Sequence, residues 1–240
     1  ISKLRMNKQR IYPEKDIQKN LKDELIPFQE TLSAEEVRKI HDNSNIVTYN
    51  KQDVIFKQNT RTSHTMFVKK GLIKVYRENR YNKTKIIKIT TPGQYLGLNS
   101  IFGEDTFSYS AEAIEMAEVL MIDSVIFEEI LQENGIFTYN LMRYLSEDNL
   151  ILFQQMISQS QKQLPGRIAD IILYFTENIF NSQNFTFPLN RTELAEMAGT
   201  TKESLIRTLT EFKNDKIIQL EGKKVKIISY DILKTLSRIG

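Results

Sequence analysis

Two side chains of opposite charge, Glu203 and Arg207, lie four positions apart in the segment from Thr201 to Asn214. On a helix this spacing places them on one face, and Thr210 falls on the same face. A carboxylate and a guanidinium group can both bond to the edges of nucleic-acid bases. An exposed polar face near the start of a helix therefore predicts a segment that reads a nucleic-acid groove.

The apolar residues of the same segment predict how the helix packs. Leu205, Leu209 and Phe212 recur at i, i+4 and i+7, so they share one face. That face must be buried. The polar side chains lie roughly opposite it, at about 100° per residue.

A second predicted helix comes just before the first. Asn190 and Glu193 have the spacing of a capping box, and Gly199 ends the helix where a positive φ costs least. Two helices joined by a tight turn resemble a helix-turn-helix, whose second helix enters the DNA major groove. The alternative is an ordinary helical hairpin inside a globular core.

Composition limits the available chemistry. The 240 residues, 40% of them hydrophobic, are enough for two domains, and the chain has no cysteine. Disulfides, thiolate zinc sites, cysteine-ligated iron–sulfur clusters and a cysteine nucleophile are therefore excluded. Residues 162–240 hold 12 Lys and Arg against 9 Asp and Glu, whereas residues 1–161 hold 21 of each. The excess positive charge lies with the predicted helix pair.

Nothing in the sequence indicates a membrane segment. The chain begins with the charged run ISKLRMNKQR, and no window approaches the roughly eighteen apolar residues that span a bilayer. We therefore expect a soluble, cytoplasmic protein without a membrane partner.

The first half of the chain predicts short helices followed by short strands. Residues 15–42 are predicted to be helical, with a break near Pro27 and a capping box that starts a new helix at Ser33. From Ile46 to Ile122 the apolar period shifts toward two, with turn residues between the runs. Many short strands predict a sandwich or barrel.

A long helix is predicted from Phe127 to Gln163. Its apolar residues form a heptad-like seam: Phe137, Leu141, Leu145, Leu152 and Met156. A monomer would leave this seam exposed, so pairing with a second copy is expected. The alternative is that the helix packs on its own β domain.

Pro165 and Gly166 mark a boundary, because proline suits the first turn of a new helix. The segment from Arg167 to Phe180 is predicted to form a helix that covers the helix pair. The segment from Asp231 to Ile239 closes the chain as a short helix.

Between these helices the sequence predicts a β-hairpin. Residues 217–220 and 225–229 flank a turn that contains Gly222. Lys223 and Lys224 at this wing could contact phosphate oxygens. The alternative is a solvated hairpin tip.

In this order of parts, the chain resembles the cyclic-AMP receptor protein and fumarate-nitrate regulator family of bacterial transcription factors. The resemblance covers about residues 33–230 and is carried by PGQYLGLNSIFGEDTFSYSAEA, LPGRIADIILYF and LNRTELAEMAGTTKESLIRTL. It implies an α+β fold with a cupin-like, cyclic-nucleotide-binding-like β-roll domain over residues 15–125. A dimerisation helix over residues 126–163 and a winged helix-turn-helix domain over residues 164–240 follow.

The resemblance also assigns DNA contacts. Glu203 and Arg207 match base-reading residues of the family, Lys202 stands just before the acid, and Arg191 matches a phosphate contact. Arginine pairs with guanine and glutamate with the cytosine amine, so a G·C-containing half-site is expected. The full set of expected DNA-binding residues is Arg191, Thr201, Lys202, Glu203, Ser204, Arg207, Lys223 and Lys224.

A regulator of this family is expected to bind as a homodimer to a palindromic operator in double-stranded DNA. Its half-sites should lie about 10–10.5 bp apart, or a multiple of that. RNA polymerase is a further partner that the resemblance allows.

The effector site departs from the cyclic-AMP binders. They place a Gly-Glu pair and an Arg-Ser pair where this chain has Gly97-Leu98 and Tyr109-Ser110. An enclosed anionic phosphate needs a cation or several donors, so cyclic nucleotide binding is not expected. A hydrophobic ligand, or none, fits better. The residues matched to this pocket are Gly97, Leu98, Asn99, Tyr109, Ser110, Leu152 and Phe153.

No cofactor and no metal are expected. An iron–sulfur cluster lacks its cysteine ligands, and His41 and His64 are the only imidazoles for haem or a metal. We therefore expect a regulator and not an enzyme. The alternatives are a constitutive DNA binder with a ligand-free β-roll and, further away, a metal-dependent enzyme of the cupin type.

Overall fold

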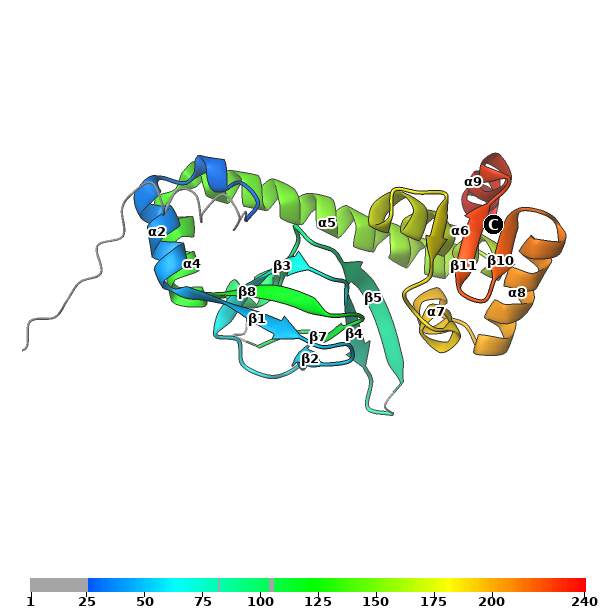
Figure 1. The fold of residues 1–240 in the computed structure, drawn as a ribbon, viewed down its shortest axis with the longest axis horizontal. Helices are drawn as coiled ribbons and strands as arrows, with labels where there is room; N and C mark the ends of the chain where they lie inside the picture. Colours follow the sequence, from blue (N-terminus) through cyan, green and yellow to red (C-terminus); the bar gives the residue numbers. More distant parts are fainter. Residues whose placement is uncertain (1–25, 82, 104–105) are drawn as a thin grey trace, which may run out of the picture.

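The structure, a computed structural model, describes residues 26–81, 83–103 and 106–240. One long helix, α5 (Gly135–Gln161), runs above a β domain toward a smaller, mostly helical C-terminal domain (Figure 1). Of the helices predicted over residues 15–42, the part before residue 26 lies outside the described residues. None of the described helices is long and apolar enough to cross a bilayer.

The predicted capping box at Ser33 is confirmed. A 3₁₀ turn, η1 (Gln29–Thr31), precedes α2 (Ala34–Asp42). The Glu36 backbone N–H donates to Ser33 Oγ at 3.2 Å, and the Ser33 N–H donates to Glu36 Oε2 at 2.6 Å. These two bonds satisfy backbone donors that the first turn of a helix leaves free.

Two antiparallel four-stranded sheets form the β-roll, which we define as residues 44–123. One sheet has the order β1 (Ser44–Tyr49), β8 (Ala117–Asp123), β3 (His64–Lys70), β6 (Tyr95–Leu96). The other has the order β2 (Val54–Phe56), β7 (Ser110–Ala113), β4 (Ile73–Glu78), β5 (Thr84–Thr90). A short helix, α3 (Leu98–Ile101), follows β6. The predicted many-stranded β domain is therefore confirmed.

The prediction of one helix from Phe127 to Gln163 is wrong. The chain forms α4 (Ser124–Glu133) and then α5, with a break at Asn134, where φ is −109° and ψ is 91°. Asn134 Oδ1 accepts a hydrogen bond from the Phe137 N–H at 2.9 Å, and its amide donates to the Thr31 carbonyl at 2.9 Å. An N-cap residue starts a new helix here, which apolar periodicity does not reveal.

The predicted seam on α5 is also wrong in its first half. Phe137 and Leu141 are 0% and 2% exposed and pack against α4 and the β-roll, with Leu145 half-buried beside them. Further along, Met156 is 61% exposed. The alternative, packing on the chain's own β domain, therefore holds for the first half of α5, because its apolar side chains lie over that domain's core.

The C-terminal domain contains the predicted helix pair. Its elements are α6 (Leu164–Tyr174), a π-helical turn η2 (Phe175–Ile179), β9 (Asn184–Thr186), α7 (Arg191–Ala198), α8 (Lys202–Asn214), β10 (Ile218–Glu221), β11 (Lys224–Ile227) and α9 (Tyr230–Ile239). Pro165 lies in the first turn of α6, as predicted, although that helix begins three residues earlier than expected. The wing has a third strand, because β9 pairs with β11.

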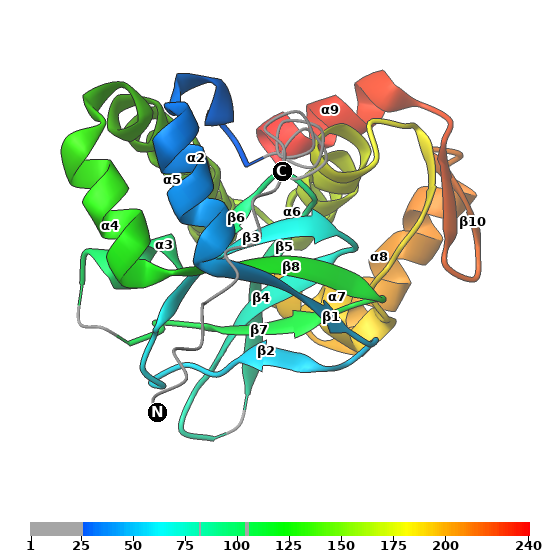
Figure 2. The same cartoon turned by 60° about the vertical axis from the view of Figure 1, so that its left-hand side comes forward.

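The C-terminal domain is docked on the β-roll of the same chain. In both views, α6 and α7 lie beside β5 (Figures 1 and 2), and the apolar core of the domain continues onto Ile86 and Ile89 of that strand. The Tyr174 hydroxyl donates to the Ile89 carbonyl at 3.0 Å and accepts from the Ile89 N–H at 3.1 Å. The position of α8 is thus fixed relative to the roll.

Candidate nucleic-acid interface

The turn between α7 and α8 has the geometry that the sequence predicts. Asn190 Oδ1 accepts from the Thr192 and Glu193 N–H groups at 2.9 and 3.0 Å. Gly199 ends α7 in the left-handed region with φ +64°, and Thr201 Oγ1 caps α8 by accepting from the Ser204 N–H. The first turn of α8 is therefore held rigidly at the surface.

The two faces of α8 are divided as predicted. Leu205, Leu209 and Phe212 are 1%, 2% and 4% exposed, and they pack in the core of the domain. Glu203 and Arg207 are exposed on the other side. We call this second side, with Lys202, Glu203, Ile206, Arg207 and Thr210, the reading face.

Ile206 is a candidate contact that the sequence interpretation missed. It is 41% exposed and lies between Glu203 and Arg207 on the reading face. An apolar side chain in the major groove can contact a thymine methyl group. The signal was present in the sequence, since position 206 falls three residues after Glu203.

The wing lies next to the start of α7. Gly222 forms the hairpin turn with φ +57°, and Lys223 and Lys224 beside it are exposed. A groove of about 330 Å³ between helix pair and wing is lined by Arg191, Lys202 and Lys223, among others. Three of the predicted DNA-binding residues therefore meet at one depression.

Arg191 has a role that the resemblance does not describe. Its Nη2 donates to the Gly222 carbonyl, and its guanidinium lies 5.8 Å from the centre of the Phe187 ring. Burial lowers the pKa of this guanidinium. Arg191 thus fastens the wing turn to the helix pair, and only part of its donor set is left for a phosphate group.

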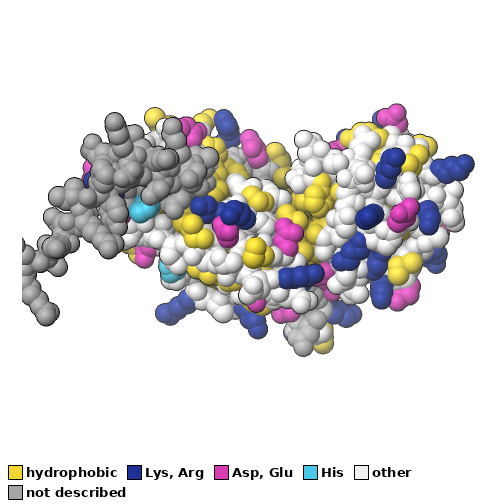
Figure 3. Space-filling view, viewed as in Figure 1, with side chains coloured by type: hydrophobic (Ala, Val, Ile, Leu, Met, Phe, Trp, Pro, Cys, Tyr) yellow, Lys and Arg dark blue, Asp and Glu magenta, His cyan; other side chains and the backbone are white. Residues whose placement is uncertain are grey.

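Lys and Arg side chains gather on the C-terminal domain. In the view of Figure 3, Lys and Arg side chains are spread over the right-hand lobe, and fewer acidic side chains lie between them. Such a surface attracts a polyanion and steers its approach.

A cluster of three charges ties the helix pair to the β-roll. Lys74 on β4 lies 2.8 Å from both Glu112 on β7 and Glu193 in the first turn of α7. Burial opposes the charge of Lys74, but its hydrogen bonds with the two carboxylates outweigh burial and raise its pKa. Burial likewise acts to raise the pKa of Glu193, and the Lys74 hydrogen bond lowers it overall.

The predicted effector residues of the roll are packed against aromatic side chains. Phe56 and Phe107 stack with ring centres 3.8 Å apart, and the Tyr109 hydroxyl accepts from the Gly97 N–H at 2.9 Å. A Cβ atom on Gly97 would lie 2.9 Å from the Phe107 ring. Ring carbons thus fill the space beside Gly97.

The other predicted effector residues are scattered. Leu98 and Ser110 are buried, Asn99 is exposed, and the Ser110 hydroxyl accepts from the Gln58 N–H at 3.0 Å. On α5, Leu152 is half-buried and Phe153 is 59% exposed. In the described part of the chain, no hydrogen bond or ring contact joins these two residues to Gly97 or Tyr109.

No group of three or more His, Cys, Asp or Glu side chains that could hold a metal occurs within the described ranges. His41 lies beside Asp42 on α2, and His64 lies beside Ser63 at the start of β3.

Fold and site together define a winged helix-turn-helix protein with a cyclic-nucleotide-binding-like β-roll. The model of the cyclic nucleotide-binding domain matches residues 46–134, and the model of the Crp-like helix-turn-helix domain matches residues 166–236. Together these matches cover more than half of the chain. The protein belongs to the cyclic-AMP receptor protein and fumarate-nitrate regulator family of DNA-binding transcription regulators.

Individual relatives agree with this assignment. The chain is 25% identical over 182 residues to the transcriptional activator protein Anr of Pseudomonas aeruginosa. The aligned segment covers 74% of each protein. It is 24% identical over 221 residues to electron transport regulator A of Shewanella oneidensis, covering 88% of this chain and 86% of that protein. Family membership points to a regulator rather than an enzyme.

Two solved structures share the fold. FixK2 from Bradyrhizobium japonicum superposes with a TM-score of 0.74 at 18% identity, over 80% of this chain and 96% of that one. A CooA mutant from Carboxydothermus hydrogenoformans gives a TM-score of 0.70 at 19% identity, over 89% of this chain and 96% of that one. The predicted α+β architecture, with β-roll, long helix and helix-turn-helix domain, is confirmed.

Removing the charge of Lys74 should loosen the docking of the helix pair. In Lys74→Met, Glu112 and Glu193 face each other without a cation. The free energy of unfolding, measured by urea denaturation at pH 7, should therefore fall by about 1–2 kcal/mol. The deficit should shrink as the pH falls through the range in which Glu193 binds a proton, because Lys74 lowers the pKa of Glu193 and the unmodified protein loses that stabilisation there. Lys70→Met is the control, since its partner Glu118 is paired at the surface, with the Lys70 side chain 70% exposed. An equal loss in both variants at every pH would contradict a specific role of Lys74.

Proposed function

We propose that this protein is a homodimeric regulator that binds a palindromic operator in double-stranded DNA through α8 and the wing. The observation that carries this proposal is that α8 has two different faces. Three large apolar side chains are buried on one face, and a carboxylate and a guanidinium are exposed on the other. As a regulator of transcription, it would act in the cytoplasm and contact RNA polymerase.

The reading face supplies base contacts in this proposal. Arg207 bonds to a guanine with two parallel hydrogen bonds, and Glu203 accepts from a cytosine amine. Ile206, between them, meets a thymine methyl group. Lys202, Ser204 and Thr201, in the first turn, lie where the helix enters the groove.

The wing and the start of α7 supply phosphate contacts. Lys223 and Lys224 are exposed at the hairpin, and Arg191 holds that hairpin against the helix pair. Phosphate contacts fix the position of the protein on the duplex without reading sequence. The remaining donors of Arg191 add to this contact.

The outward face of α5 is the proposed dimer interface. We define this face as the exposed apolar side chains Tyr139, Met142, Leu150, Phe153, Met156 and Ile157, which are 46–68% exposed. At 100° per residue they gather on the side of α5 away from Phe137 and Leu141. An apolar stripe along a surface helix is what a paired helix buries.

A second candidate is a constitutive DNA binder whose β-roll takes no ligand. The observation that favours it is the packing of Phe56, Phe107 and Tyr109 beside Gly97. Under this reading, operator affinity does not depend on a small molecule in the roll.

Arg207→Ala should weaken binding to a selected operator by about 1–3 kcal/mol and relax selectivity at one base pair in each half-site. Lys213→Ala is the matched control, because Lys213 is an exposed cation in the last turn of the same helix. Competition binding against every single-base variant of the operator measures both effects. A uniform loss on operator and random DNA would contradict base reading by Arg207.

The paired change of Lys223 and Lys224 to Ala should lower affinity equally on all sequences. Each lost phosphate contact should also reduce the dependence of log K on log salt concentration by about one unit. Fluorescence anisotropy over a series of salt concentrations gives this slope, with Lys51→Ala, in the turn between β1 and β2, as the control. A slope identical to that of the unmodified protein would remove the wing from the DNA contacts.

Phe153→Glu should shift the protein from dimer to monomer by at least about tenfold in the dissociation constant, because a dimer would bury two carboxylates without partners. Val125→Glu introduces the same charge at an apolar side chain of α4 that is 65% exposed, against 59% for Phe153. Sedimentation equilibrium compares the two variants. Equal dimerisation in both would place the interface elsewhere.

A further inference from the structure

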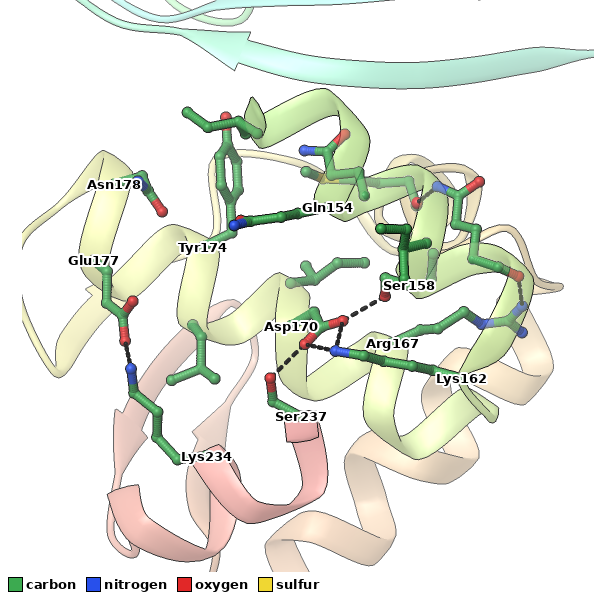
Figure 4. A pocket seen from close by; sticks show the side chains of 18 residues that line it. Gln154, Ser158, Lys162, Arg167, Asp170, Tyr174, Glu177, Asn178, Lys234 and Ser237 are labelled. Carbon is green, nitrogen blue, oxygen red and sulfur yellow. Dashed lines mark hydrogen bonds and ion pairs between the residues drawn. The ribbon is translucent and has the colours of Figure 1, made fainter. Parts of the chain in front are cut away.

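A cavity of about 390 Å³ opens where the end of α5 passes over the C-terminal domain (Figure 4). Its walls come from α5, α6, η2, α9 and the last turn of α7. Ile171 and Tyr174 on α6, Gln154 on α5 and Asn178 on η2 are among the residues that line it. Organic ligands commonly occupy pockets of this size at the junction of two domains.

The acidic groups of the cavity already have partners. Asp170 accepts from Ser158, Ser237 and Lys162, the last at 2.8 Å. Glu177 is paired with Lys234 at 2.9 Å. A cationic ligand would therefore have to displace existing bonds.

Arg167, in contrast, lies in the wall without a carboxylate. Its Nη1 reaches only the Gln159 carbonyl, at 3.5 Å, and its Nε is buried without a hydrogen-bond partner among the described residues. A buried donor without an acceptor costs free energy, and most such donors in proteins are satisfied. Within the described ranges, Arg167 therefore has no strong acceptor.

A second cation, Lys85, contacts the wall of the cavity at Met197. Lys85 on β5 donates to the Met197 carbonyl at 3.3 Å, and no ion pair with a carboxylate is formed by it within the described part of the chain. Burial, and then the charge of Arg167, lower the pKa of Lys85 to about 8. Met197 and Gln159 belong to the cavity wall as well. Lys85 is not itself among the residues that line the cavity, and its link to the cavity wall is the Met197 carbonyl.

We propose that this cavity binds a small organic anion, with the acidic group at Arg167 and an apolar body along Ile171 and Tyr174. Such an anion would give the Arg167 guanidinium an anionic partner, which it lacks among the described residues, and would offset its repulsion with Lys85. The site is separate from the β-roll positions Gly97 and Tyr109, where aromatic rings occupy the space.

A ligand here would touch α5 and the helices of the DNA-binding domain at once. It would therefore favour one pose of the reading face relative to the dimer helix. This consequence rests on the proposed function, whereas binding of the anion does not.

Two fluorescent probes of the same shape test the proposal on the full chain. 8-Anilino-1-naphthalenesulfonate carries the anionic group, and N-phenyl-1-naphthylamine is the same ring system without it. We expect the sulfonate to bind with one site per chain and at least about tenfold more tightly than the neutral probe, as a charge-assisted hydrogen bond requires. Equal affinities, or no binding of the sulfonate, would overturn the proposal.

Substitutions locate the site. Arg167→Met should abolish the preference for the sulfonate, Arg167→Lys should retain most of it, and the control Lys51→Met should leave it unchanged. A preference that survives in Arg167→Met places the anion elsewhere and refutes the assignment. Far-UV circular dichroism shows whether Arg167→Met folds. If it does not, the difference in affinity between the two probes on the unmodified protein still tests the proposal. Since no DNA is present, failure here leaves the DNA-binding proposal standing.

Discussion

Burial of the apolar side of α8 is the constraint on which the remaining architecture depends. Leu205, Leu209 and Phe212 must be removed from water, and α6, α7 and the wing supply the surface that covers them. Once that side is buried, the polar side chains of α8 have only one direction to face. Orientation of the reading face is thus a by-product of the hydrophobic effect, and the capped turn at Gly199 fixes its angle to α7.

The same apolar core does not end at the domain border. It continues onto Ile86 and Ile89 of β5, and the two hydrogen bonds of Tyr174 seal its edge. The reading face is therefore connected to the β-roll through packed side chains. Tyr174 also lines the cavity beside Arg167, so that cavity borders this contact.

Several features that depend on neighbouring residues were predicted correctly from the sequence. Several features that depend on contacts between distant residues were not. The capping boxes at Ser33 and Asn190 and the buried stripe of α8 need only neighbouring residues, and all three are confirmed. The sequence of strand β7, SAEA, lacks the branched residues typical of strands, so sequence alone does not mark it as one. The predicted seam that begins with Phe137 and Leu141 was assigned to a second copy because sequence alone does not say which side of the helix meets the β-roll. Lys74 and Glu193 are 119 positions apart, so no local sequence pattern predicts that they pair.

Glu193 uses its two oxygens for two different tasks. Oε2 accepts from the Asn190 N–H and completes the cap of α7, while Oε1 holds Lys74 of the β-roll. One rotamer of one side chain therefore serves both local helix order and attachment between domains. If the DNA-binding domain swung away from the roll, this carboxylate would regain torsional freedom, and the first turn of α7 would fray more readily. Domain separation and end-fraying of that helix are in this way thermodynamically coupled.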